Sequence, residues 1–138
     1  MNLNFVLNNI WLVLAALVSG GILLWPLVNK RISGVPEVGA LEAVQLLNRK
    51  DAVLIDVREP AEFSAGHAPN ARNIPLAQLG KRIAELEKFK NRPAVVICQT
   101  GGRSHAATAL LKKAGFGQVV VLAGGIGAWQ QANMPVEK

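Results

Sequence analysis

The chain has 138 residues, of which 51% are hydrophobic, and a formal net charge of +6. This length suits one domain and little more. A single cysteine excludes an internal disulfide framework and a multi-thiolate metal centre, and two histidines argue against a histidine-rich metal site. The scattered basic pairs predict a solvated surface, or one that attracts an anionic lipid leaflet or small anionic substrates. We expect no metal, no cofactor and no nucleic-acid partner.

The first part of the chain is apolar. Residues 10–28 contain few residues that are not plainly apolar, and as a helix they would span roughly 28 Å, close to the hydrocarbon thickness of a bilayer. Trp11 and Trp25 lie near the two ends of this stretch, where amphipathic rings favour the membrane interface. We therefore expect residues 5–28 to contact a lipid bilayer, and the segment could also meet a membrane-protein partner.

The flanks of this stretch favour an anchor over a cleaved signal peptide. No Lys or Arg precedes the apolar core, and no Ala-x-Ala cleavage site follows it. The basic pair Lys30-Arg31 comes after the span, which places the C-terminal side in the cytoplasm by the positive-inside rule. The sequence predicts a single-pass anchor of the inner (plasma) membrane with its linker in residues 1–33, and a cytoplasmic domain in residues 34–138.

In the second part, apolar runs of strand length alternate with helical patterns. Helices are predicted over residues 40–49, 61–64 (opened by Pro60), 79–89, 104–114 and, after a glycine turn, up to residue 131. Strands are predicted over residues 52–57, 93–98 and 117–122, with a short extended piece at 73–76. This alternation predicts a compact α/β domain whose central, mostly parallel sheet is flanked by helices.

Three residues fall at the carboxyl ends of predicted strands: Asp56, Cys98 and Ala123. Ligands of open α/β sheets bind outside the carboxyl ends of the strands. One crevice could therefore gather all three positions.

The loop that starts at the only cysteine carries the strongest chemical signal. It runs from a strand into a helix through Cys98, Gln99, Thr100, Gly101, Gly102, Arg103 and Ser104. Backbone N–H groups of such a loop can converge on one point, and the helix dipole adds to their field. A thiolate is stabilised there, and so is an anion bonded to it. A lone cysteine is often only a buried apolar residue, but this glycine-rich setting favours a reactive thiol.

Three stretches resemble the rhodanese-like family of sulfurtransferases. They are residues 56–63 together with 66–75, residues 98–103, and residues 122–129. With the apolar segment in front, the chain is similar to the membrane-attached rhodanese-like proteins of bacteria. One departure is mild: the family usually has Ile-Pro-Gly where this chain has Ala68-Pro69-Asn70, and Asn tolerates a left-handed conformation.

The resemblance implies sulfur transfer through Cys98. As a thiolate, Cys98 would attack the outer sulfur of a donor such as thiosulfate or a persulfide, and the resulting persulfide would pass its sulfur to an acceptor thiol or to cyanide. The amides of residues 99–104 would hold the anionic sulfur. Arg103 would bind a sulfonate oxygen or brace the loop through Asp56, and Asp56 and Arg58 would be supporting residues.

Other conspicuous residues have structural interpretations. We expect His67 to pin its loop by hydrogen bonding, and His105 to face solvent in the first turn of its helix. Trp129 is expected to pack the last helix on the sheet, and Gly124 and Gly125 to permit a tight turn.

Two alternatives remain open. Some cysteine phosphatases share this fold, but their signature has five residues between Cys and Arg, whereas four separate Cys98 from Arg103. That smaller ring of amides suits a sulfur atom rather than a phosphoryl group. The second alternative is a membrane-anchored interaction or regulatory module with little turnover. The presence of Cys98 argues against it, because inactive domains of this kind often lack the thiol.

Overall fold

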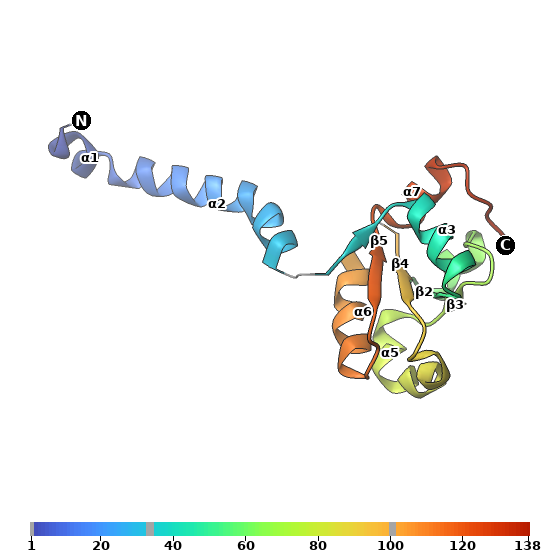
Figure 1. The fold of residues 1–138 in the computed structure, drawn as a ribbon. Coiled ribbons are helices and arrows are strands. Elements are labelled where there is room, and N and C mark those ends of the chain that lie inside the picture. Colours follow the sequence, from blue (N-terminus) through green and yellow to red (C-terminus); the bar gives the residue numbers. More distant parts are fainter. Residues whose placement is uncertain (1, 33–34, 100–101) are drawn as a thin grey trace. The chain divides into compact units, whose positions relative to one another are not determined.

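The computed structural model describes residues 2–32, 35–99 and 102–138, and the chain divides into two compact units, residues 1–34 and 35–138 (Figure 1). The first unit contains α1 (Leu3–Asn8) and α2 (Ile10–Ile32). Within α2, the 19 residues from Ile10 to Val28 have a mean hydropathy of 2.2, and none of them is buried in the protein. This confirms one N-terminal helix that is long and apolar enough to cross a membrane.

The second unit is built on a five-stranded parallel sheet (Figure 1). Its strand order is β1-β5-β4-β2-β3, and each pair of neighbours runs parallel. The strands are β1 (Glu37–Val38), β2 (Val53–Asp56), β3 (Arg72–Asn73), β4 (Ala94–Ile97) and β5 (Val119–Leu122). The predicted α/β domain with a parallel central sheet is thereby confirmed.

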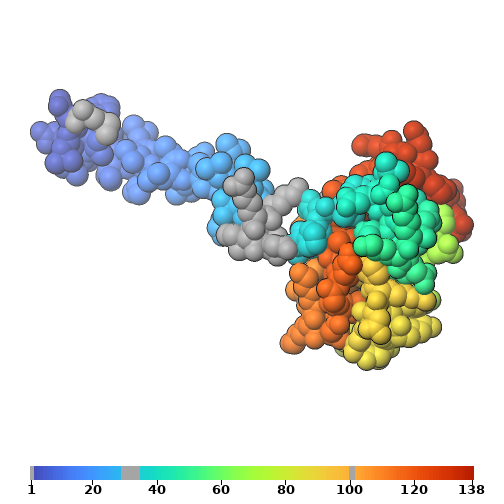
Figure 2. All heavy atoms as spheres, in the orientation of Figure 1, coloured from blue at the N-terminus to red at the C-terminus, as the bar shows by residue number. Residues whose placement is uncertain are grey.

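Helices cover both faces of this sheet. The helical segments of the second unit are α3 (Ala40–Arg49), α4 (Pro60–Ala65), α5 (Leu76–Arg82), the 3₁₀ helix η1 (Ile83–Phe89), α6 (Gly102–Lys113) and α7 (Gly125–Gln131). One core cluster joins the sheet to α5, η1 and α6, and the other joins it to α3 and α7. In the space-filling view, α3 and the C-terminal segment that includes α7 lie next to each other (Figure 2).

The three central strands show why their sequences read as uninterrupted apolar runs. Every residue of β2, β4 and β5 is buried. A parallel strand with helices on both faces needs apolar side chains on both sides, so period-two alternation disappears. The predictions for these strands and for the 40–49 helix are confirmed, and Pro60 opens α4 as expected.

Two parts of the second unit differ from the sequence-based expectation. The single helix predicted over residues 79–89 is wrong: α5 begins at Leu76, and the second half is η1. The reason lies in the spacing of Ile83, Leu86 and Phe89, which pack against one core cluster at intervals of three residues. Such spacing matches the three residues per turn of a 3₁₀ helix. In addition, β1 was not predicted from the sequence. Its two residues pair with Val121 and Leu122 of β5.

Candidate active site

The carboxyl ends of β2, β4 and β5 bring together the residues expected to form one crevice. Asp56 ends β2, Cys98 directly follows β4, and the turn at Gly124 and Gly125 follows β5. The N–H of Ile126 donates to the carbonyl oxygen of Cys98 at 2.8 Å. The glycine turn therefore lies directly against the start of the cysteine loop.

Gly125 makes this close approach sterically feasible. Its φ is +62°, and a Cβ added there would lie 2.2 Å from the Cys98 carbonyl oxygen and 2.6 Å from that of Gln99. Both the left-handed backbone and the contact therefore require a residue without a side chain. The tight turn expected from the sequence therefore packs directly against the backbone of Cys98 and Gln99.

The cysteine loop itself is held between β4 and α6. Cys98 is 1% exposed, and α6 begins at Gly102. The predicted loop residues Thr100 and Gly101 lie outside the described residues. Ser104 is fully buried in the first turn of α6, and its hydroxyl has no hydrogen-bond partner among the described residues. The first N–H groups of a helix have no partner inside the helix, so α6 can offer donors to an anion on the Cys98 side.

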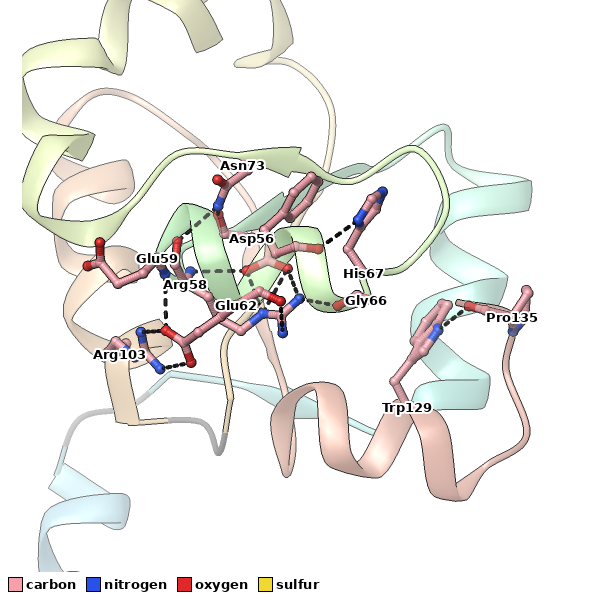
Figure 3. A network of polar contacts seen from close by, with 11 residues as sticks. Asp56, Arg58, Glu59, Glu62, Gly66, His67, Asn73, Arg103, Trp129 and Pro135 are labelled. Carbon is pink, nitrogen blue, oxygen red and sulfur yellow. Dashed lines mark hydrogen bonds and ion pairs between the residues drawn. The ribbon is translucent and has the colours of Figure 1, made fainter. Parts of the chain in front are cut away.

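Arg103 pairs with Glu62 and not with Asp56, which corrects the expectation that it braces the loop through Asp56. Its Nη1 and Nη2 donate to Glu62 Oε1 and Oε2 at 2.6 and 2.9 Å (Figure 3). This bidentate bond from the guanidinium lowers the pKa of Glu62 to about 2, and the same bond raises the pKa of Arg103. The α4 carboxylate and the α6 guanidinium therefore form a charged pair that joins α4 to the first turn of α6.

Asp56 pairs with Arg58 instead. Arg58 Nε and Nη2 donate to the Asp56 carboxylate at 2.8 to 3.1 Å, and the Arg58 backbone N–H donates to Oδ1 at 3.0 Å. Both residues are buried, at 0% and 3% exposure. Arg58 Nη2 also donates to the Gly66 carbonyl, and Nη1 donates to the carbonyl of Glu62 (Figure 3). Through these two bonds, the buried Arg58 holds the backbone of residues 62–66, which carries the Glu62 side chain.

A cavity of about 370 Å³ opens beside the cysteine loop. It is lined by Arg58, Glu62, Ala65, Gly66, Gln99, Ile126 and Gln130. Gln99 and Ile126 adjoin Cys98 through the chain and through a hydrogen bond, respectively. The cavity therefore lies next to the start of the cysteine loop, and Cys98 itself does not line it.

A larger cavity of about 500 Å³ lies beside the start of β2, bordered by Val53, Arg72 and Trp129 among others. Cys98 does not line it. Among residues 2–32, 35–99 and 102–138, no group of three His, Cys, Asp or Glu side chains is arranged to hold a metal ion.

The other singled-out residues have structural partners. His67 Nδ1 lies 2.9 Å from the carbonyl oxygen of Phe63, and the two rings stack at 3.8 Å. The expectation that His105 faces solvent is wrong: its ring is partly buried, and Nε2 lies 2.9 Å from Glu37 Oε1. Trp129 is buried in the core cluster shared by α3 and α7, and its indole N–H donates to the Pro135 carbonyl at 2.8 Å.

Sequence reasoning missed Glu62 as part of this site. The residue stands in the third position of α4, where its Oε1 also accepts the backbone N–H of Glu59 at 3.1 Å as half of a capping box. The capping pattern was legible in the sequence. The pair with Arg103, 41 residues away, depends on how α4 and α6 pack and has no local signature.

Comparisons with known proteins agree with this geometry. The family model described as "Rhodanese-like domain" matches residues 40–132. A sulfurtransferase from Allochromatium vinosum is 37% identical over 92 residues, covering 67% of this chain and 84% of the relative. A thiosulfate sulfurtransferase from Pseudoalteromonas translucida is 30% identical, covering 69% and 89% of the two chains. The crystal structure of a rhodanese-related protein from Thermoplasma volcanium superposes with a TM-score of 0.64 at 34% identity, covering 74% of this chain and 97% of that one.

Proposed function

The chain belongs to the rhodanese-like family, and from that premise we propose that it is a sulfurtransferase that carries sulfane sulfur as a persulfide on Cys98. The observation that carries the proposal is the position of Cys98. It follows a buried parallel strand, precedes the N-terminus of α6, and rests against the glycine turn after β5. Relatives with sulfurtransferase names support the class of reaction.

The proposed chemistry needs only the thiolate and the surrounding donors. The Cys98 thiolate attacks the outer sulfur of the donor, a new S–S bond forms, and the donor's own bond to that sulfur breaks with its electron pair going to the leaving group. With thiosulfate the leaving group is sulfite. An acceptor thiolate or cyanide then takes the outer sulfur and regenerates the Cys98 thiolate. Backbone N–H groups of residues 99–104 stabilise the anionic persulfide.

The test is a mass and turnover measurement on the full-length chain in detergent. After incubation with thiosulfate, or with a small-thiol persulfide, we expect Cys98 to gain the mass of one sulfur atom and to form thiocyanate when cyanide is added. The Cys98→Ser variant is expected to gain no sulfur and to form thiocyanate at background level. A wild-type chain that stays unmodified with both kinds of donor would contradict the proposal and favour the interaction module.

We further propose that residues 1–33 form a single-pass anchor with its linker, and that residues 34–138 form the cytoplasmic domain. The support is the helix of membrane-spanning length in α2 and the basic pair Lys30-Arg31 that follows the apolar window. The anchor would hold the sulfur-transfer site near the bilayer.

Protease added to intact cells tests this orientation. We expect a tag fused after Lys138 to survive until the membrane is permeabilised, because the domain would be shielded on the cytoplasmic side. Replacing Lys30 and Arg31 with Gln should reduce the fraction of chains in this orientation, because these charges would set it. Digestion of the tag in intact cells would overturn the cytoplasmic placement.

A further inference from the structure

The cavity beside Cys98 offers no unneutralised cation. Its two charged lining residues are Arg58 and Glu62, and each is already paired: Arg58 with buried Asp56, and Glu62 with Arg103. The remaining polar side chains of the lining are the amides of Gln99 and Gln130. Within the described part of the chain, an anion that enters this cavity meets the Glu62 carboxylate, two amides and an Arg58 guanidinium that Asp56 already neutralises.

Only one member of the Glu62–Arg103 pair belongs to the cavity wall. Glu62 lines the cavity and Arg103 does not. Both Nη atoms of Arg103 are engaged with Glu62, at 2.6 and 2.9 Å. Because the pKa of Glu62 is lowered to about 2 by this bond, the carboxylate stays ionised throughout the physiological range of pH. Its negative charge is thus a constant property of the site.

We propose that Glu62 makes the site select organic persulfides over thiosulfate as the sulfur donor, by binding Arg103 and by placing a carboxylate in the donor's path. The inference rests on the proposed sulfur transfer and specifies its donor class. In this proposal Glu62 is a specificity-determining residue, because it lines the cavity in which the donor's leaving group would lie.

The two donors differ in the charge that their leaving groups carry. With an organic persulfide R–S–SH, the Cys98 thiolate forms a bond to the outer sulfur, the S–S bond of the donor breaks, and R–S⁻ leaves with the electron pair and one negative charge. With thiosulfate, the same attack releases sulfite, which carries two negative charges on its oxygens. A leaving dianion needs a cation that can bind it, and Arg103 is already occupied by Glu62. Neither reaction requires an external oxidant or reductant.

The test compares the two donors with wild type and Glu62→Gln, each as the full-length chain in an uncharged detergent. Gln keeps the side-chain oxygen that accepts the Glu59 N–H, so the cap of α4 is retained. It removes the negative charge and leaves the Arg103 guanidinium able to bind an anion. We expect the rate of persulfide formation from thiosulfate to rise about three- to tenfold. The rate from the persulfide of 2-mercaptoethanol, whose leaving thiolate carries one negative charge, is expected to change by less than about twofold.

Glu85→Gln is the matched control. Glu85 forms a similar bidentate pair with Arg82, at 2.7 and 3.1 Å, on α5 and η1 and away from the cavity. Its replacement changes the net charge of the chain by the same amount, and we expect no change in the preference between the donors. Glu62→Met also removes the charge. It serves as a second variant if Glu62→Gln unfolds at a clearly lower temperature than wild type.

The outcomes separate this inference from the proposed function. If wild type forms the Cys98 persulfide equally well from both donors, or if neither Glu62 variant shifts the ratio, the donor selection is wrong and the sulfur transfer stands. A shift that Glu85→Gln reproduces would also contradict it, because bulk charge would then be the cause. If no variant and no donor yields a persulfide on Cys98, the proposed function itself fails.

Discussion

Replacing Gly125 with alanine is expected to destabilise the domain by about 3 kcal/mol or more and to reduce sulfur transfer to near background. The added Cβ would lie 2.2 Å from the Cys98 carbonyl oxygen, and the φ of +62° is itself unfavourable for alanine. The strain can be relieved only by moving the α7 turn or the cysteine loop. Either movement displaces the donors around Cys98. Denaturant unfolding and thiocyanate formation measure the two effects.

Gly127→Ala is the matched control for this substitution. Gly127 stands in the same helix, α7, and a Cβ added there would meet no heavy atom within 4 Å. Alanine favours a helix more than glycine does, so we expect equal or slightly greater stability and unchanged sulfur transfer. Normal activity in the Gly125→Ala variant would show that the close approach to Cys98 is not needed for the chemistry.

Replacing Asp56 with asparagine should cost about 3 kcal/mol of folding stability. Asp56 accepts three donors of Arg58 in a buried site, and Asn would remove the charge and turn an NH₂ group toward the guanidinium. The guanidinium would be left buried without a counter-charge. Because Arg58 also binds the carbonyl groups of Glu62 and Gly66, we expect the loss of donor selectivity to accompany the loss of stability.

Asp51→Asn provides the comparison for Asp56→Asn. Asp51 pairs with Arg92 at 3.1 Å, but the Asp51 side chain is 77% exposed, so the expected cost is below about 1 kcal/mol. Asn also tolerates the positive φ of +54° at this position. Equal effects of the two substitutions in thermal unfolding would mean that burial of the Asp56–Arg58 pair contributes nothing.

The sequence was sufficient wherever one local rule decided the structure. The apolar runs of β2, β4 and β5 follow from burial on both faces of a parallel sheet, and Pro60 begins α4 because its fixed φ suits the first helical turn. The position of Cys98 at a strand end and before a helix also followed from pattern alone. These elements place the expected crevice at the carboxyl edge of the sheet.

The sequence was insufficient wherever distant segments compete for one partner. The sequence pointed to Asp56 as the acidic partner of Arg103, but the tertiary placement of α4 and α6 brings Glu62 to it instead. His105 similarly meets Glu37, which belongs to a strand too short to show any periodicity. Long-range pairing of this kind depends on tertiary distances that a linear pattern does not contain.

The place of β1 in the sheet has a consequence for the order of events during synthesis. β1 is the first strand of the domain, and it pairs with β5, the last one, through residues Glu37 and Val121. The chain must therefore be nearly complete before its first strand can dock, and pairing of strands so far apart in sequence slows folding. On the ribosome, α2 emerges long before β5, so a membrane segment at this end would reach the bilayer while the domain is still unfinished.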